Sequence, residues 1–255
     1  MKQLVRKQSL LLGCLFFFLT GISSNVFAKT YGQYLCSNHS DYACYKVTRG
    51  DTWEKLYADE QTRDLVKRIN RVNVPLQSGM VIAVPKEYVA LNYFSLAPFP
   101  AKIATNGQKI MIFDPSKLAW AAYNSQGDLV RWGPASGGNT WCADVRRSCR
   151  TAQGEFSIYR KQGKGCISGK YPLEKGGGAP MPYCMFFNKG FAFHGSPTVP
   201  GYNASHGCVR LYVEDAQWLN ENFVSTNPNE RVKVKILPYQ KQYQHQSAIT
   251  TTTNQ

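Results

Sequence analysis

The chain has 255 residues, of which 43% are hydrophobic and 18% are charged, and its formal net charge is +14. This length allows one large domain with a small one, or two modest ones. After the first 28 residues no stretch approaches the ~20 apolar residues of a membrane helix, which excludes a transmembrane segment in the mature protein. The charge favours an anionic partner, with solubility as the alternative explanation.

Residues 1–28 have the three parts of a secretory signal peptide. Basic residues precede an apolar run at residues 10–19, and the Val-Phe-Ala of residues 26–28 resembles a cleavage site. We therefore expect an exported protein of the periplasm or cell wall. Its anionic partners there are cell-wall polymers or lipids, not nucleic acid. A lipoprotein box ending at Cys14 is the alternative, but most of the apolar run follows Cys14.

Seven cysteines follow the predicted signal peptide. Export favours disulfides, so six cysteines can pair and one stays free. Six cysteines allow 15 connectivities. Proximity in sequence alone gives the pairs Cys36–Cys44, Cys142–Cys149 and Cys166–Cys184, and leaves Cys208 as the free thiol. The chain has no C-x-x-C pair, so zinc is disfavoured and we expect neither a metal nor a cofactor.

Residues 44–86 predict a small domain with the order strand, helix, helix, strand. Tyr45 and Val47 alternate like a strand, Asp51 or Thr52 can cap a helix, and Leu65 starts the apolar face of a second helix. This region resembles a LysM module, which implies binding to the N-acetylglucosamine-containing glycan of peptidoglycan or chitin. A small structural domain without sugar binding is the alternative. The matching residues are Tyr45, Val47, Gly50, Asp51, Thr52, Leu56, Asn70, Leu76, Gly79, Val84 and Pro85.

Residues 87–99 predict an aromatic linker whose side chains pack between two domains. From residue 101 short alternating runs are separated by Gly and Pro turns, which predicts a mainly β domain over 101–238, a largely antiparallel sandwich or barrel. One helix is expected, over 214–222. Residues 239–255 lack an apolar pattern and predict a disordered tail. The expected strands cover residues 109–113, 118–123, 129–133, 154–159, 185–187, 191–193 and 232–237.

Two short segments carry the chemistry: Phe193-His194-Gly195-Ser196 and Ser205-His206-Gly207-Cys208-Val209-Arg210-Leu211. A nucleophilic thiolate needs a base nearby, small residues around the sulfur and a cation for an anionic substrate. Together these residues favour an enzyme that forms a thioester, and His194 is expected to raise the thiolate fraction of Cys208.

These segments resemble the signature of the YkuD-type L,D-transpeptidases, and the likeness extends over about residues 103–237. The interval from His194 to Ser205 is short for that family. The resemblance implies cleavage of the bond between diaminopimelate and D-alanine in a tetrapeptide stem of peptidoglycan, followed by transfer of the acyl group from a cysteine to a second stem. The product is a 3→3 cross-link. Water as acceptor would make an L,D-carboxypeptidase, and some members use a lipoprotein lysine.

The resemblance also implies the catalytic roles. Cys208 is the expected nucleophile and His194 the base, with the Gly195 carbonyl holding the second imidazole nitrogen. The amides of Gly207 and Cys208 are candidates for an oxyanion hole. Arg210 is expected to bind a stem carboxylate or to brace the loop.

Four further residues are expected to shape the pocket: Ser205, His206, Tyr183 and Met185. For Tyr183 and Met185 a place in the core is the favoured alternative. Two other functions stay open. A papain-like peptidase would need an Asn beside the base and a long helix after the cysteine. A catalytically weak peptidoglycan-binding protein would need no reactive thiol. The sequence does not fix the oligomeric state.

Overall fold

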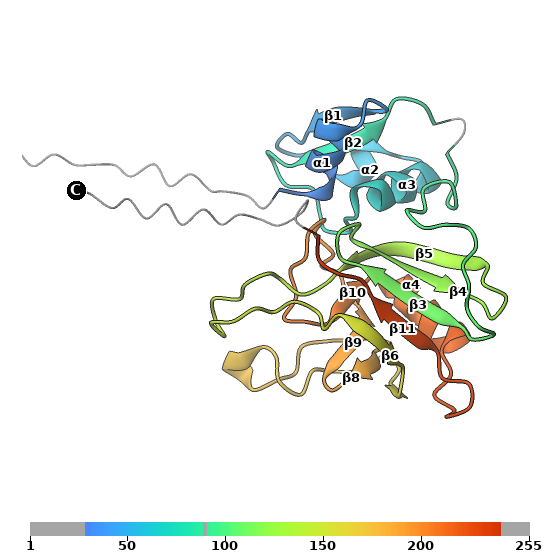
Figure 1. Ribbon diagram of the computed structural model, residues 1–255. Coiled ribbons are helices and arrows are strands. Elements are labelled where there is room, and N and C mark those ends of the chain that lie inside the picture. The colour runs from blue at the N-terminus through green and yellow to red at the C-terminus, as the bar shows by residue number, and fades with distance from the viewer. Residues whose placement is uncertain (1–28, 89–90, 241–255) are drawn as a thin grey trace, which may run out of the picture.

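The computed structural model describes residues 29–88 and 91–240, so the predicted signal peptide lies outside the described residues. The N-terminal unit contains α1 (Tyr31–Asn38), β1 (Tyr42–Lys46), α2 (Trp53–Leu56), α3 (Glu60–Asn70) and β2 (Val81–Pro85). Strands β1 and β2 pair antiparallel, with Tyr42 opposite Pro85 and Lys46 opposite Val81. The expected strand-helix-helix-strand order is present (Figure 1), and α1 precedes it.

Local capping explains where the two predicted helices begin. The Thr52 hydroxyl accepts from the Lys55 amide at 3.3 Å at the start of α2, and the Asp59 carboxylate accepts from the Thr62 amide at 2.7 Å at the start of α3. Trp53 is 4% exposed and lies in a small apolar core between these helices and the two-stranded sheet.

The predicted start of this unit at residue 44 is too late. Tyr31 and Leu35 of α1 are buried against Ile69 and Ala83, and the Cys36–Cys44 disulfide ties α1 to β1. Sequence reasoning missed α1 because its eight residues show little amphipathic pattern.

In the larger unit, described strands form one nine-stranded sheet in the order β6-β11-β3-β4-β5-β10-β9-β8-β7. Most neighbours are antiparallel, but β11 pairs parallel with β3 and β10 pairs parallel with β9. The strands are β3 (Ile110–Asp114), β4 (Ala119–Tyr123), β5 (Leu129–Ser136), β6 (Gly154–Ser157), β7 (Arg160–Lys161), β8 (Met185–Asn188), β9 (Phe191–Gly195), β10 (Val209–Leu211) and β11 (Lys233–Ile236).

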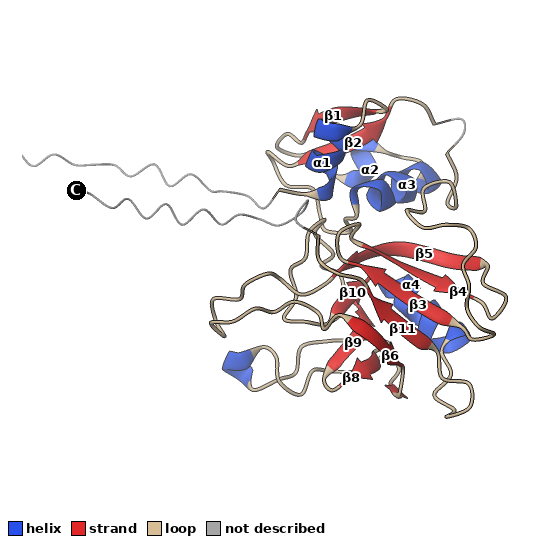
Figure 2. Cartoon of the chain, in the orientation of Figure 1, coloured by secondary structure: helices blue, strands red, loops and turns tan. Residues whose placement is uncertain are grey.

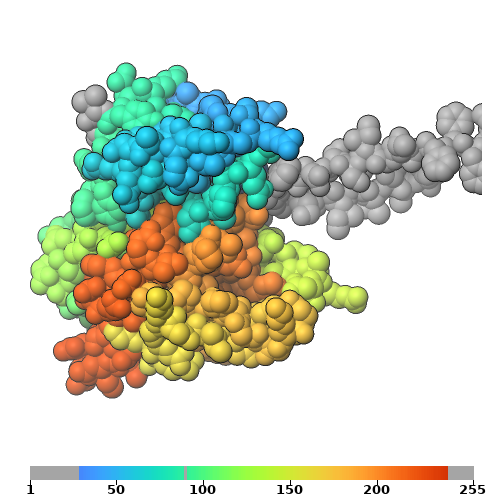
Figure 3. All heavy atoms as spheres, turned by 180° about the vertical axis from the view of Figure 1, so that it is seen from behind, coloured from blue at the N-terminus to red at the C-terminus, as the bar shows by residue number. Residues whose placement is uncertain are grey.

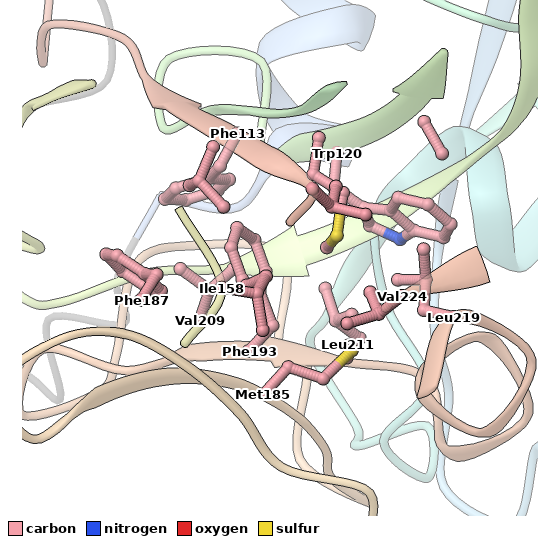
Figure 4. Close-up of a cluster of buried hydrophobic side chains, with 14 of the residues drawn as sticks. Phe113, Trp120, Ile158, Met185, Phe187, Phe193, Val209, Leu211, Leu219 and Val224 are labelled. Carbon is pink, nitrogen blue, oxygen red and sulfur yellow. The ribbon is translucent and has the colours of Figure 1, made fainter. Parts of the chain in front are cut away.

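This sheet curls on itself, because its two edge strands β6 and β7 are nearly consecutive in the chain. Between them the Ile158 amide donates to the Val232 carbonyl at 3.0 Å, and the Tyr159 amide donates to the Phe186 carbonyl at 3.0 Å. The concave side encloses the main apolar core, in which Phe113, Trp120 and Phe193 are fully buried (Figure 4). The predicted mainly β fold is confirmed.

Helices are a minor part of this unit (Figure 2). The predicted helix over 214–222 corresponds to α4 (Val213–Trp218), which continues as a π-helical turn, η2 (Leu219–Phe223). A short 3-10 turn, η1 (Leu173–Lys175), lies in the long loop before β8. Among the described residues no helix is both long and apolar enough to cross a membrane.

Most described apolar side chains of the linker pack as predicted, whereas Tyr88 and Phe94 are 37% and 52% exposed. The Tyr93 ring stacks on Trp132 at 5.6 Å, and the Trp132 indole N–H donates to the Tyr93 carbonyl at 2.6 Å. The predicted tail begins too early, since the Tyr239 hydroxyl accepts from the Thr151 amide at 3.1 Å. Residues 241–255 lie outside the described residues.

A buried ionic network joins the two units. The Asp215 carboxylate in α4 is completely buried and accepts from Arg68 of α3 at 3.1 Å and from Arg131 of β5 at 2.9 Å. The Arg68 side chain also pairs with Asp64 at 2.7 Å. Two arginines therefore share one buried countercharge at the interface, which fixes α3 against α4 and β5.

Asp215→Asn should strongly destabilise the protein, because it leaves Arg68 and Arg131 without their buried countercharge. We expect the free energy of unfolding to fall by about 3–5 kcal/mol in denaturant titrations. The control is Lys102→Ala, which removes an ion pair with Asp128 whose side chains are 68% and 50% exposed, and should change stability far less. Equal losses in the two variants would contradict this role of Asp215.

Candidate active site

The two motif segments meet because β9 and β10 are parallel neighbours, with His194 opposite Arg210 and Phe193 opposite Val209. Phe193, Val209 and Leu211 point into the main core and are fully buried. Successive side chains of a strand alternate between the two faces, so His194 and Arg210 lie on the other face. Cys208 precedes β10 by one position and shares that face with them.

The Cys208 thiol is the free cysteine of the described chain, and the three predicted disulfides are confirmed. It is half-buried and packs against a small cluster that includes Ala192 and the Cys166–Cys184 disulfide. The thiol donates a weak hydrogen bond to the Gly190 carbonyl at 3.7 Å. The hairpin between β8 and β9 and the disulfide loop therefore form its walls.

The His194 imidazole is buried at 6% exposure in β9. Its Nδ1 lies 2.9 Å from the Gly195 carbonyl oxygen, which is the contact expected from the sequence. A carbonyl can only accept, so Nδ1 carries the proton and Nε2 keeps a free lone pair in the neutral ring. In this tautomer Nε2 can accept a proton from a thiol.

Burial keeps both reactive groups neutral. It lowers the pKa of His194 to about 4, against a smaller opposite effect of the Gly195 hydrogen bond. It raises the pKa of the Cys208 thiol, while a hydrogen bond from Ala192 and the charge of Arg210 lower it. Desolvation outweighs the nearby cation, so burial favours the protonated thiol at neutral pH, whereas the sequence led us to expect an enriched thiolate.

The small residues before Cys208 shape its loop. Gly207 has φ +130°, and a Cβ there would lie 2.1 Å from the Phe191 ring, so only glycine fits. The Ser205 hydroxyl accepts from the Gly207 amide at 3.0 Å and donates to the Cys208 carbonyl. The Gly207 amide is thus already used, which argues against its predicted place in an oxyanion hole and leaves the Cys208 amide as the candidate.

His206 connects two loops beside the thiol. Its Nε2 contacts the Asp144 carboxylate at 2.7 Å, and its ring lies 4.5 Å from the Tyr171 ring. Asp144 lies within the Cys142–Cys149 loop and Tyr171 within the Cys166–Cys184 loop. The predicted pocket-shaping role fits these contacts. Sequence reasoning missed Asp144 and Tyr171, and the disulfide spacing was the one signal that marked their loops as structured.

Arg210 is partly exposed, and its guanidinium donates to the Thr198 carbonyl and hydroxyl at 3.4 Å each. Burial lowers its pKa, while the Cys208 thiol raises it. This contact with the loop after His194 fits the bracing role, and the exposed part of the side chain remains accessible to a carboxylate.

Two predicted pocket residues do not reach the site. Met185 is completely buried and lies beside Phe193 and Leu211 in the main core (Figure 4), and Tyr183, at 7% exposure, belongs to the same core. The alternation of β8 directs Met185 away from Cys208, so the structure places both residues in the core, the favoured alternative, and not at the pocket.

Potential metal ligands near the site are already engaged. The sulfurs of Cys142 and Cys149 and a ring nitrogen of His206 lie within 4.8 Å of one another. The two cysteines form a disulfide with each other, so they supply no thiolate for a metal.

Comparison with known families decides the identity of the larger unit. The family model of the L,D-transpeptidase catalytic domain (YkuD) matches residues 107–236, which is half of the chain and includes β3 to β11. The chain belongs to the L,D-transpeptidase family. Members of this family act on peptidoglycan outside the cytoplasm, and the three disulfides of this L,D-transpeptidase fit an exported protein.

Several solved structures are similar to this L,D-transpeptidase. One from Xylanimonas cellulosilytica is 23% identical over 69% of this chain and 79% of that chain, with a TM-score of 0.49. The structure from Stackebrandtia nassauensis is 18% identical and covers 55% of this chain and 60% of its own, with a TM-score of 0.42. The structure from Mycobacterium smegmatis is 18% identical and covers 51% of this chain and 59% of its own, with a TM-score of 0.41. A search of curated proteins found no match.

Thiol labelling should give one alkylated residue, Cys208, when the mature protein is denatured without reductant. In the native protein at pH 7 iodoacetamide should react more slowly than with the denatured chain, because burial raises the thiol pKa. The native rate should increase with pH beyond 9. Label on a second cysteine, or faster labelling of the native protein at pH 7, would contradict this description.

Proposed function

We propose that this protein is a peptidoglycan L,D-transpeptidase that forms 3→3 cross-links through a thioester on Cys208. The observation that carries the proposal is the pairing of β9 with β10, which sets a neutral imidazole on the same face as the free thiol. His194 is oriented by the Gly195 carbonyl, so its unprotonated Nε2 is the proton acceptor that an acyl transfer needs.

The proposed reaction starts from a protonated thiol. As the Cys208 sulfur attacks the carbonyl carbon of the diaminopimelate–D-alanine bond, its proton moves to Nε2 of His194. In this proposal the Cys208 amide stabilises the oxyanion of the tetrahedral intermediate. The imidazolium then protonates the leaving amine, D-alanine departs and the thioester forms.

The second half of the reaction reverses these proton transfers. The acceptor amine attacks the thioester carbonyl, the imidazole takes the proton of the amine, and the imidazolium returns a proton to the departing sulfur. A new amide and the free thiol result. Arg210, at the exposed side of Cys208, is proposed to bind a carboxylate of the stem.

We further propose that residues 44–86 bind the glycan of peptidoglycan. The LysM-like order of β1, α2, α3 and β2 supports this, and so does the positive charge of the chain. Sedimentation of the mature Cys208→Ser variant with insoluble peptidoglycan tests the proposal, since chito-oligosaccharides should compete with specific glycan binding but not with a purely charge-driven association.

Mass spectrometry of the products tests the reaction directly. The purified mature protein is incubated with disaccharide-tetrapeptide, and a cross-linked dimer that has lost one D-alanine is the expected product. Cys208→Ser should lower its rate at least about 10³-fold, because a serine hydroxyl is far less acidic than a thiol and does not transfer its proton to this weakly basic histidine during attack. A tripeptide without dimer would show a carboxypeptidase. Absence of any product from a wild-type protein whose Cys208 is labelled would indicate a binding protein.

The pH dependence follows from the neutral imidazole. A base must be unprotonated, so kcat/KM should persist as the pH falls from 7 to about 5 and decline only through the His194 pKa of about 4. The rate of acylation by a carbapenem, measured at each pH by mass spectrometry of the intact protein, gives this acid limb of the profile. Circular dichroism at each pH verifies that the protein stays folded. An acid limb centred near the ordinary histidine value of about 6.5 would contradict the assignment.

A further inference from the structure

The loop between the two motif segments is held by the N-terminal unit. Asn73, which follows α3, donates from Nδ2 to the Ser196 carbonyl at 2.8 Å and accepts from the Val199 amide at Oδ1 at 2.8 Å. Its own amide donates to the Val199 carbonyl at 3.0 Å. One asparagine of the N-terminal unit therefore makes three hydrogen bonds to the two ends, Ser196 and Val199, of a four-residue segment that begins directly after His194-Gly195. Figure 3 shows the N-terminal unit, in blue to teal, resting on the orange segments of the larger unit.

Asn73 is itself fixed in place. The preceding residue, Val72, is 1% exposed, and its carbonyl accepts from the Tyr212 hydroxyl at 2.7 Å. Val72 also forms an isolated bridge with Pro200. Together with the buried pair of Arg68 and Asp215, these contacts prevent the N-terminal unit from sliding over the loop.

The same loop anchors the arginine of the site. Thr198 lies between the two residues that bind the Asn73 side chain, and the guanidinium of Arg210 donates to its carbonyl and hydroxyl oxygens. The Ser196 hydroxyl lies 3.0 Å from the Thr198 hydroxyl and accepts from the Thr198 amide at 3.1 Å. Displacement of residues 196–199 would therefore displace the atoms that Arg210 binds.

Arg210 acts on both reactive groups. Its positive charge lowers the pKa of the Cys208 thiol and that of the His194 imidazole. It faces Tyr202 as well as Cys208. A cation near a thiol favours the thiolate, and the effect depends steeply on distance in a buried site. The distance between the Arg210 guanidinium and the Cys208 thiol therefore affects the reactivity of the thiol.

We propose that Asn73 is a positioning residue of the active site, which holds residues 196–199 so that Thr198 keeps Arg210 beside Cys208 and His194. The N-terminal unit then contributes to catalysis through this contact, whether or not it binds glycan. The inference rests on the proposed function for the roles of Cys208 and Arg210, but its test uses the thiol itself.

The experiment measures iodoacetamide labelling of Cys208 in the mature protein as a function of pH. Asn73→Ala should move the profile to higher pH by about half a unit, so the rate near pH 8 falls about threefold, because Arg210 loses its fixed anchor. The control is Asp64→Asn, which weakens the same interface at Arg68 without touching the loop and should leave the profile in place. If Asn73→Ala does not fold, Asn73→Ser, which is also uncharged and too short to span Ser196 and Val199, should shift the profile in the same direction.

A double-mutant cycle with Arg210→Ala separates positioning from general loosening. If Asn73 acts through Arg210, Asn73→Ala should cause no further shift in the Arg210→Ala background. Additive shifts would overturn the proposal, and so would a rate that changes by the same factor at every pH, since that pattern reflects access to the thiol. Labelling needs no peptidoglycan, so a failed proposal on Asn73 is distinct from a failed transpeptidase assay.

Discussion

The parallel pairing of β9 with β10 is the constraint on which the rest of the site depends. It places His194 opposite Arg210 and carries Cys208 onto the same face, while Phe193, Val209 and Leu211 enter the core on the other. Two parallel strands cannot be joined by a tight turn, so the chain must leave the sheet between them. The connection between β9 and β10 packs against the N-terminal unit, and this is why residues 196–199 contact both Asn73 and Arg210.

Burial determines the resting chemistry of the site. A buried imidazole and a half-buried thiol favour their uncharged forms, and one partly exposed guanidinium does not reverse that preference. The proposed mechanism therefore has the proton move during attack instead of starting from a preformed ion pair. Such a site gains its nucleophile only when an acyl donor is in place, which protects the thiol from other electrophiles between turnovers.

The fold, the disulfides and the free thiol were largely predictable because their signals are local. Alternating residues gave most strands, short separations gave the three disulfides, and one compact motif gave Cys208 and His194. The contacts that the sequence did not predict are those that depend on packing between residues far apart in the chain. Asn73 contacts a residue 123 positions away and His206 pairs with Asp144 across 62 positions, and no sequence period records such partners. The sequence left both the pocket and the core open for Met185, because alternation shows that a strand has two faces, but not which of them meets the core.

The three disulfides join cysteines that are consecutive in the chain, with separations of 8, 7 and 18 residues. A polypeptide that emerges from a translocation channel with its N-terminus first would expose each pair together, before the next pair appears. Cys208 would be the last cysteine to emerge, after every possible partner had been oxidised. The order of cysteines along the chain thus favours correct oxidation without isomerisation, and it leaves Cys208 without a free cysteine to pair with.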